Sequence, residues 1–173
     1  PFLCKSLSVR GCTFNQLSSD QFYAGRALVG TFGEGFTTFT DCTFKNSGGL
    51  TGGMDTCLFK VNHTNGQLVI SNCYSNASRV FVNSPYDDYC VVENCSLTVS
   101  PDEAFNPAIR AGVVSNNSIT LLSTANGQIA VEATRLCEGN IIKNVGSAIA
   151  IGIQIDPSAS SMVDITGNSI ALT

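Results

Sequence analysis

A short motif recurs seven times along the chain, and this repetition constrains the possible folds more than any other feature. Each copy has an apolar residue, then any residue, then Gly, Asp or Asn, then Cys or Asn. The copies are VRGC (9–12), FTDC (39–42), ISNC (70–73), VENC (92–95), VSNN (114–117), CEGN (137–140) and ITGN (165–168). Recurrence at intervals of about 22 to 31 residues is typical of proteins built from stacked repeat units.

The residues around each motif predict β-strands. LVISNCYS and VVENCSL, for example, alternate apolar and polar residues and are rich in β-branched residues. Second strand-like stretches lie between most motifs: RALVGTF, CLFKVN, SRVFVNS, GQIAVEA and SAIAIGIQI. Only 101–112 could carry a turn of helix, and its two prolines limit it. The sequence therefore predicts an all-β chain in which corresponding strands of successive units stack in parallel.

The last position of the motif predicts a buried corner residue. Cys12, Cys42, Cys73 and Cys95 share this position with Asn117, Asn140 and Asn168. A position that accepts Cys or Asn needs a small side chain that points inward. We therefore expect free, buried thiols rather than disulfides, which favours folding in a reducing compartment. A zinc site is not expected, because the chain has no CxxC pair and one histidine, His63.

This motif and its asparagine column resemble the right-handed, single-stranded parallel β-helix of the pectate-lyase-like superfamily, and most of all bacteriophage tailspikes and tail fibres. The resemblance covers nearly the whole chain. It implies one β-helix domain over residues 1–173, a solenoid of about six to seven coils. Because the chain begins with Pro1 rather than Met, we expect it to be part of a longer protein.

Composition narrows the functional classes. The net charge is −4 with only nine Lys and Arg residues, which argues against a nucleic-acid partner. No apolar run is long enough to predict membrane insertion. Charged residues make up 13% of the chain, about half of the usual share of roughly 25%. We therefore expect part of the surface to be covered by another chain.

The resemblance implies a virion tail protein, made in the host cytoplasm, that binds bacterial surface polysaccharide during host attachment. Whether it also depolymerises the glycan, as hydrolase or lyase, is left open. The alternatives are a secreted monomeric polysaccharide lyase or glycoside hydrolase, and a non-catalytic structural shaft or adhesin. Parallel β-helices host several activities, so the fold alone does not choose between them.

Alternation along the strands assigns an outward column with two carboxylates. The column is Arg10, Thr40, Ser71, Glu93, Ser115, Glu138 and Thr166. Glu93 and Glu138 lie two units apart, about 9–10 Å at the usual strand spacing. Inverting glycosidases hold their two carboxyls about 6.5–9.5 Å apart. The pair is a catalytic candidate, although a solvent-facing position can also carry Glu twice without any catalytic role.

Two loops supply further candidates. Asp87 and Asp88 are candidate catalytic acids in SPYDDYC, and Tyr86 and Tyr89 beside them could stack on sugar rings. The second loop, SPDEAFNP, offers Asp102, Glu103 and Phe105 for substrate binding. Adjacent carboxylates are also common in solvated turns. No metal ligand set and no cofactor motif is present, and the glycine-rich stretches 30–35 and 46–53 are expected to be loops because neither opens a helix.

A second outward column predicts self-association. Its members Val69, Val91, Val113 and Leu136 form an apolar row. The stretch SAIAIGIQI offers a comparable face, in which Ala148, Ala150 and Gly152 are small enough for close approach of another chain. Because tailspikes are parallel homotrimers, the resemblance implies a homotrimer, with a covering loop as the alternative for the row.

Overall fold

The computed structural model describes residues 6–15, 27–31, 35–45, 57–61, 66–78, 80–84, 89–99, 107–122, 125–155 and 162–172. These residues form eighteen strands and no helix, so the all-β prediction is confirmed. Accordingly, the described part of the chain contains no helix that could cross a membrane. The segment in which one helical turn was conceivable is extended from Pro107 onward, while 101–106 lie outside the described residues.

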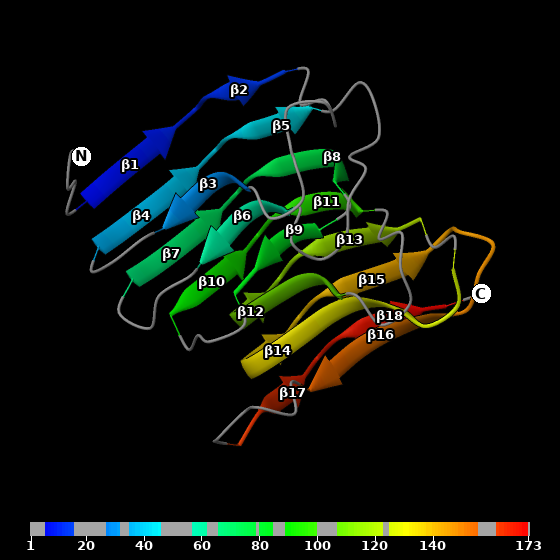
Figure 1. Cartoon of the computed structure of the whole chain (residues 1–173). Helices are drawn as coiled ribbons and strands as arrows, with labels where there is room; N and C mark the ends of the chain where they lie inside the picture. The colour runs from blue at the N-terminus through cyan, green and yellow to red at the C-terminus, as the bar shows by residue number, and fades with distance from the viewer. Residues whose placement is uncertain are drawn as a thin grey trace.

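All strand pairs are parallel and belong to two sheets, of eleven and seven strands. The larger sheet folds back on itself through β12 (Pro107–Ser115) and β14 (Gln128–Glu138), which belong to both of its halves. We call these halves ladder 1 and ladder 2, and the smaller sheet ladder 3 (Figure 1). Parallel pairing between strands far apart in sequence is compatible with the β-helix that the sequence predicts.

Each ladder collects the equivalent strand from successive repeat units. Ladder 1 contains β1 (Ser6–Arg10), β4 (Gly35–Thr40), β7 (Gly66–Ser71), β10 (Cys90–Glu93), the C-terminal parts of β12 and β14, and β17 (Asp164–Thr166). Ladder 2 contains β3 (Ala27–Thr31), β6 (Cys57–Val61), β9 (Val80–Asn83), the N-terminal parts of β12 and β14, and β16 (Ala150–Ile155). Ladder 3 contains β2 (Thr13–Phe14), β5 (Thr43–Lys45), β8 (Tyr74–Ser78), β11 (Ser96–Val99), β13 (Ser118–Leu121), β15 (Ile141–Asn144) and β18 (Ser169–Ala171).

The third motif position explains why each ladder 1 strand ends where it does. Its seven occupants all have positive φ, between 53° and 64°: Gly11, Asp41, Asn72, Asn94, Asn116, Gly139 and Gly167. Gly, Asn and Asp are the residues that adopt this left-handed conformation at least cost. One such residue turns the chain sharply between a ladder 1 strand and the following ladder 3 strand. The local sequence thus fixes the corner of every unit.

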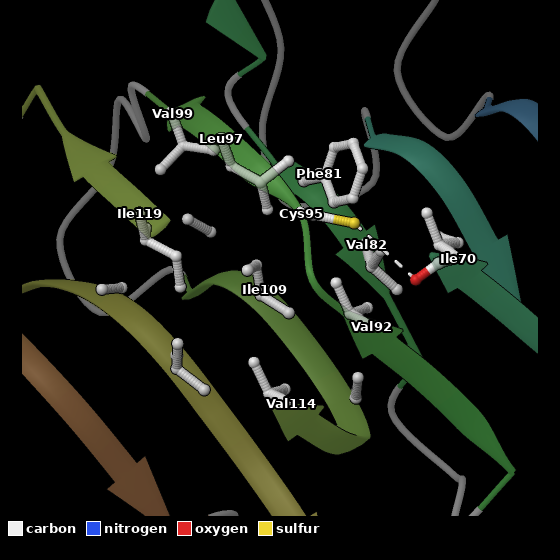
Figure 2. Close-up of a cluster of buried hydrophobic side chains, with 14 of the residues drawn as sticks. Ile70, Phe81, Val82, Val92, Cys95, Leu97, Val99, Ile109, Val114 and Ile119 are labelled. Atoms are coloured by element: carbon white, nitrogen blue, oxygen red, sulfur yellow. Dashed lines mark hydrogen bonds between the residues drawn. The ribbon is translucent and has the colours of Figure 1, made fainter. Parts of the chain in front are cut away.

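The fourth motif position forms a continuous hydrogen-bonded column behind this corner. Asn117 and Asn140 each donate an amide N–H to a carbonyl of the preceding unit, that of Val92 at 3.0 Å and that of Val114 at 2.9 Å. The thiol of Cys95 donates to the equivalent carbonyl, Ile70, at 3.7 Å (Figure 2). Cys and Asn therefore fill one role, as the sequence predicted.

The core lies between the ladders. At its N-terminal end, five phenylalanines stack or meet edge to face: Phe14, Phe39, Phe44, Phe59 and Phe81. Further along, the interior is aliphatic, with Leu97, Ile109, Val114 and Ile119 fully buried (Figure 2). In β9 and in the N-terminal part of β14 even adjacent residues, such as Phe81 and Val82, are buried, so these two segments show no alternation.

Ladder 1 follows the predicted alternation. Phe39, Ile70, Val92, Val114 and Cys137 point inward and are buried. The equivalent residues of the outermost units, Val9 and Ile165, are only partly covered because each has a neighbouring strand on one side. The alternate residues therefore project from the outer side of ladder 1, where the candidate site lies.

Candidate functional site

The outer side of ladder 1 carries three rows of side chains, which together we call the outer face. Strand register aligns each row across successive units. The polar row is Thr40, Ser71, Glu93, Ser115 and Glu138; the middle row is Thr38, Val69, Val91, Val113 and Leu136; the third row is Phe36, Gln67 and Tyr89. The face is therefore polar along one side, apolar in the middle and aromatic along the other side.

The predicted position of the two glutamates is confirmed. Ser115 pairs with Glu93 on one side and with Glu138 on the other, so the two carboxylates are two units apart in one row. Two strand spacings correspond to about 9–10 Å between backbones. Both side chains are partly exposed, while Ser115 between them is buried. The structure thus aligns the pair in one row, with a backbone spacing close to the carboxyl separation of about 6.5–9.5 Å that inverting glycosidases use.

The repeat gives the two glutamates nearly the same surroundings. Glu93 follows inward-facing Val92 and precedes Asn94, while Glu138 follows inward-facing Cys137 and precedes Gly139. A glycosidase needs one protonated carboxyl and one ionised carboxyl, and these roles arise from contrasting environments. Equivalent environments do not produce that contrast. Both carboxylates can accept hydrogen bonds from a ligand.

Most loop candidates cannot be placed. Tyr86, Asp87, Asp88, Asp102, Glu103 and Phe105 lie outside the described residues. Tyr89 is described, and 45% of its surface is exposed. Its carbonyl accepts a hydrogen bond from the Leu68 N–H at 3.2 Å, which places Tyr89 beside Gln67 at the start of β10.

Phe36 is a surface aromatic residue that the sequence interpretation missed. It pairs with Gln67, its side chain lies on the same side as Thr38, and 44% of its surface is exposed. It follows the glycine-rich stretch 30–35, which was expected to be a loop. The structure corrects this prediction at both ends, because Gly30 belongs to β3 and Gly35 begins β4. The available signal was the period-2 pattern of GFTTFT, which begins directly after the glycines.

The cysteines do not form a reactive site. The six whose side chains are described are free, and of these only Cys12 is exposed. Burial raises the pKa of Cys42, and it raises the pKa of Cys137 to about 11. Interaction with the Cys73 thiol and burial together raise the pKa of Cys95, whereas the same interaction lowers the pKa of Cys73. A thiol must ionise to act as a nucleophile or metal ligand, so Cys42, Cys95 and Cys137 act structurally.

A buried ion pair in ladder 2 also escaped the sequence interpretation. Arg110 and Glu132 are register partners on β12 and β14, and the Arg110 Nε contacts a carboxylate oxygen of Glu132. Both side chains are largely removed from solvent. Removing one partner would leave an uncompensated buried charge, so the pair constrains the alignment of these strands.

Exposed apolar side chains gather in the last two repeat units. Of the twelve large hydrophobic residues that are exposed in the described part of the chain, eight lie there: Ile141, Val145, Ile149, Ile155, Met162, Ile165, Ile170 and Leu172. We call this set the C-terminal apolar surface. The prediction that Ala150 and Gly152 face outward is wrong. Ala150 is buried, and a Cβ on Gly152 would lie 2.7 Å from Ile170 Cγ2. The exposed side chains of this segment are instead Ile149 and Ile155.

Comparisons with known proteins return no relatives: no family model, curated protein or solved structure matches this chain. Within the part of the chain that the structure describes, no three His, Cys, Asp or Glu residues are grouped so that they could hold a metal ion. The candidate site is therefore defined by the geometry of the outer face alone.

Proposed function

We propose that the chain winds into a right-handed parallel β-helix of the pectate-lyase-like type. The observation that supports this best is the corner of the repeat. Seven positive-φ residues are each followed by a Cys or Asn that is aligned with its neighbours by strand pairing. In a β-helix such a column satisfies the backbone groups that the bends leave unpaired.

We further propose that this β-helix belongs to a phage tailspike or tail fibre that binds bacterial surface polysaccharide. The supports are the resemblance, the free thiols of a protein made in a reducing cytoplasm, and the outer face. That face combines exposed aromatic rings, an apolar row and hydrogen-bonding groups. Carbohydrate sites need this combination, because sugar rings have both apolar faces and hydroxyl edges.

Self-association is part of the proposal, as a homotrimer. One candidate interface is the C-terminal apolar surface, where Ile149 and Ile155 are 69% and 50% exposed. Large exposed apolar patches mark association sites. The middle row of the outer face is a weaker candidate, since Val69, Val91, Val113 and Leu136 are already partly covered.

The alternatives are a secreted monomeric lyase or hydrolase and a non-catalytic shaft. The test is to incubate the protein with purified O-antigen and capsular polysaccharides, and to measure both binding and glycan chain length. Binding without shortening indicates an attachment protein, while shortening indicates a depolymerase. Absence of binding to every glycan in the panel would favour the shaft. Sedimentation would separate a trimer from the monomer expected of a secreted enzyme.

A further inference from the structure

We propose that the outer face binds an uncharged polysaccharide, with sugar rings stacked on Phe36 and Tyr89 and hydroxyl groups bonded to Gln67, Glu93 and Glu138. This inference rests on the proposed function and adds the place and the class of the glycan. The residues that form it are all among those that the structure describes.

The third row of the outer face provides two aromatic rings on which sugar rings can stack. Phe36 and Tyr89 are separated by one unit, that of Gln67, so their backbones are about 9–10 Å apart. Both rings are nearly half exposed, and Gln67 between them is also exposed. Aromatic rings bind the apolar C–H faces of sugars, and an amide between them can donate to and accept from hydroxyls. A linear glycan running along the row would meet the two rings with alternate sugar units.

The size of the face favours a glycan over a protein partner. Three rows over at most five units cover on the order of 400 Å², from the strand spacing and the rise per residue. A standard protein–protein interface buries about 800 Å² on each partner. The outer face alone is too small for such an interface, whereas it is long enough for several sugar units. The partly covered valines of the middle row then form the floor beneath the glycan.

The charges on the face favour an uncharged glycan. Glu93 and Glu138 lie in the polar row, and Asp164 pairs with Leu136 at the end of the middle row. Ionised carboxylates accept strong hydrogen bonds from hydroxyl groups. Arg10, at the N-terminal end of the polar row, contacts Asp41 at 3.0 Å, which offsets its charge. Polysaccharides that carry uronate or phosphate groups would be repelled by the two glutamates.

The experiment measures binding of the full chain to neutral O-antigen polysaccharides and to uronate-containing capsular polysaccharides. Isothermal titration calorimetry measures the affinity of the wild-type chain and of the variants Phe36→Ala and Tyr89→Ala for each glycan. The matched control is Tyr74→Ala, because Tyr74 is 43% exposed but lies on ladder 3, away from the outer face. Circular dichroism and thermal melting verify that each variant is folded, and Phe36→Tyr tests whether an aromatic ring at this position restores affinity.

The expected result is binding of a neutral glycan that weakens at least tenfold in Phe36→Ala and in Tyr89→Ala. Affinity should be unchanged in Tyr74→Ala and largely kept in Phe36→Tyr. If the wild-type chain binds a glycan but the two alanine variants bind equally well, the location is wrong while the proposed function stands. Preference for uronate polymers overturns the class of ligand. If no glycan binds, the proposed function and this inference both fail.

Discussion

The side-chain oxygen of Asn140 accepts two hydrogen bonds from Asn117, one from its backbone N–H and one from its amide, both at 3.0 Å. In the same way, the side-chain oxygen of Asn168 accepts two hydrogen bonds from Asn140, one from its backbone N–H and one from its amide, both at 2.9 Å. Each asparagine thus ties its own unit to the preceding one. The column is a cooperative chain of buried polar groups, and such a chain stabilises a structure only when every member is satisfied.

Asn117→Ala should destabilise the fold strongly. The substitution leaves the Cys95 N–H and the Val92 carbonyl without their partner in a buried site, and it removes one of the two hydrogen bonds that the Asn140 side-chain oxygen accepts. Each unsatisfied buried group costs about 1–3 kcal/mol, so we expect the free energy of unfolding to fall by about 2 kcal/mol or more. Urea unfolding measures this loss.

Asn117→Cys is the matched control, because Cys73 and Cys95 hold the same position in earlier units. Its thiol can donate to the Val92 carbonyl, so the loss should be clearly smaller than for alanine. Equal losses for the two variants would show that Cys and Asn are not equivalent in this column.

The corner position tolerates only residues that adopt positive φ. Asn94 has a φ of 53° and is exposed, so its side chain contributes little packing. Asn94→Val should lower the free energy of unfolding by about 1–2 kcal/mol, the usual cost of the left-handed conformation. Asn94→Gly should be close to neutral. Chemical unfolding of both variants tests this, and similar stabilities would contradict the role assigned to the corner.

Much of this architecture could be predicted from the motif. Alternation around a fixed Cys or Asn position correctly gave the inward residues from Phe39 to Cys137 and placed Glu93 and Glu138 in one row. These predictions succeeded because period-2 alternation leaves only two orientations for each side chain. The positive φ of Asp41 and the three asparagines was encoded in the same motif, as the preference for Gly, Asn and Asp.

Predictions for ladder 2 were less successful, for a physical reason. Strand β9 and the N-terminal part of β14 are buried on both sides, and β16 has apolar residues or glycine at successive positions, so the sequence does not distinguish inside from outside in these strands. Ala150 and Gly152 were therefore assigned to the surface, although Ile149 and Ile155 are the exposed residues. The Arg110–Glu132 pair was missed because its members are 22 residues apart and only the register brings them together.

The fold should lose stability at alkaline pH through its thiols. Burial raises the pKa of Cys137 from 9.0 to about 11 in the folded chain. A raised pKa means that the folded state holds the proton more tightly, so its contribution is complete below pH 9 and is lost as the pH rises through 11. The free energy of unfolding, measured between pH 8 and pH 11, should fall less steeply in Cys137→Ala than in the wild type. Parallel profiles would show that Cys137 does not titrate in this window.

Self-association should depend on the C-terminal apolar surface. Ile149→Asp and Ile155→Asp place charges on the C-terminal apolar surface and should shift the sedimentation coefficient from trimer to monomer. Tyr74→Asp is the control, because Tyr74 is comparably exposed on β8 in the middle of ladder 3. If Val91→Asp abolishes the trimer and the isoleucine variants do not, the outer face is the interface and its assignment to a glycan is wrong.

The two glutamates should act alike, because the repeat places them in equivalent positions. Glu93→Gln and Glu138→Gln each remove one carboxylate and keep a hydrogen-bonding side chain, so each should weaken binding of a neutral glycan only severalfold. A catalytic pair would respond differently, since loss of a general acid or base lowers the rate about 10²–10⁴-fold. Glycan chain length after incubation with each variant distinguishes the two roles. Cleavage that disappears in one or both variants while binding persists would identify the pair as catalytic.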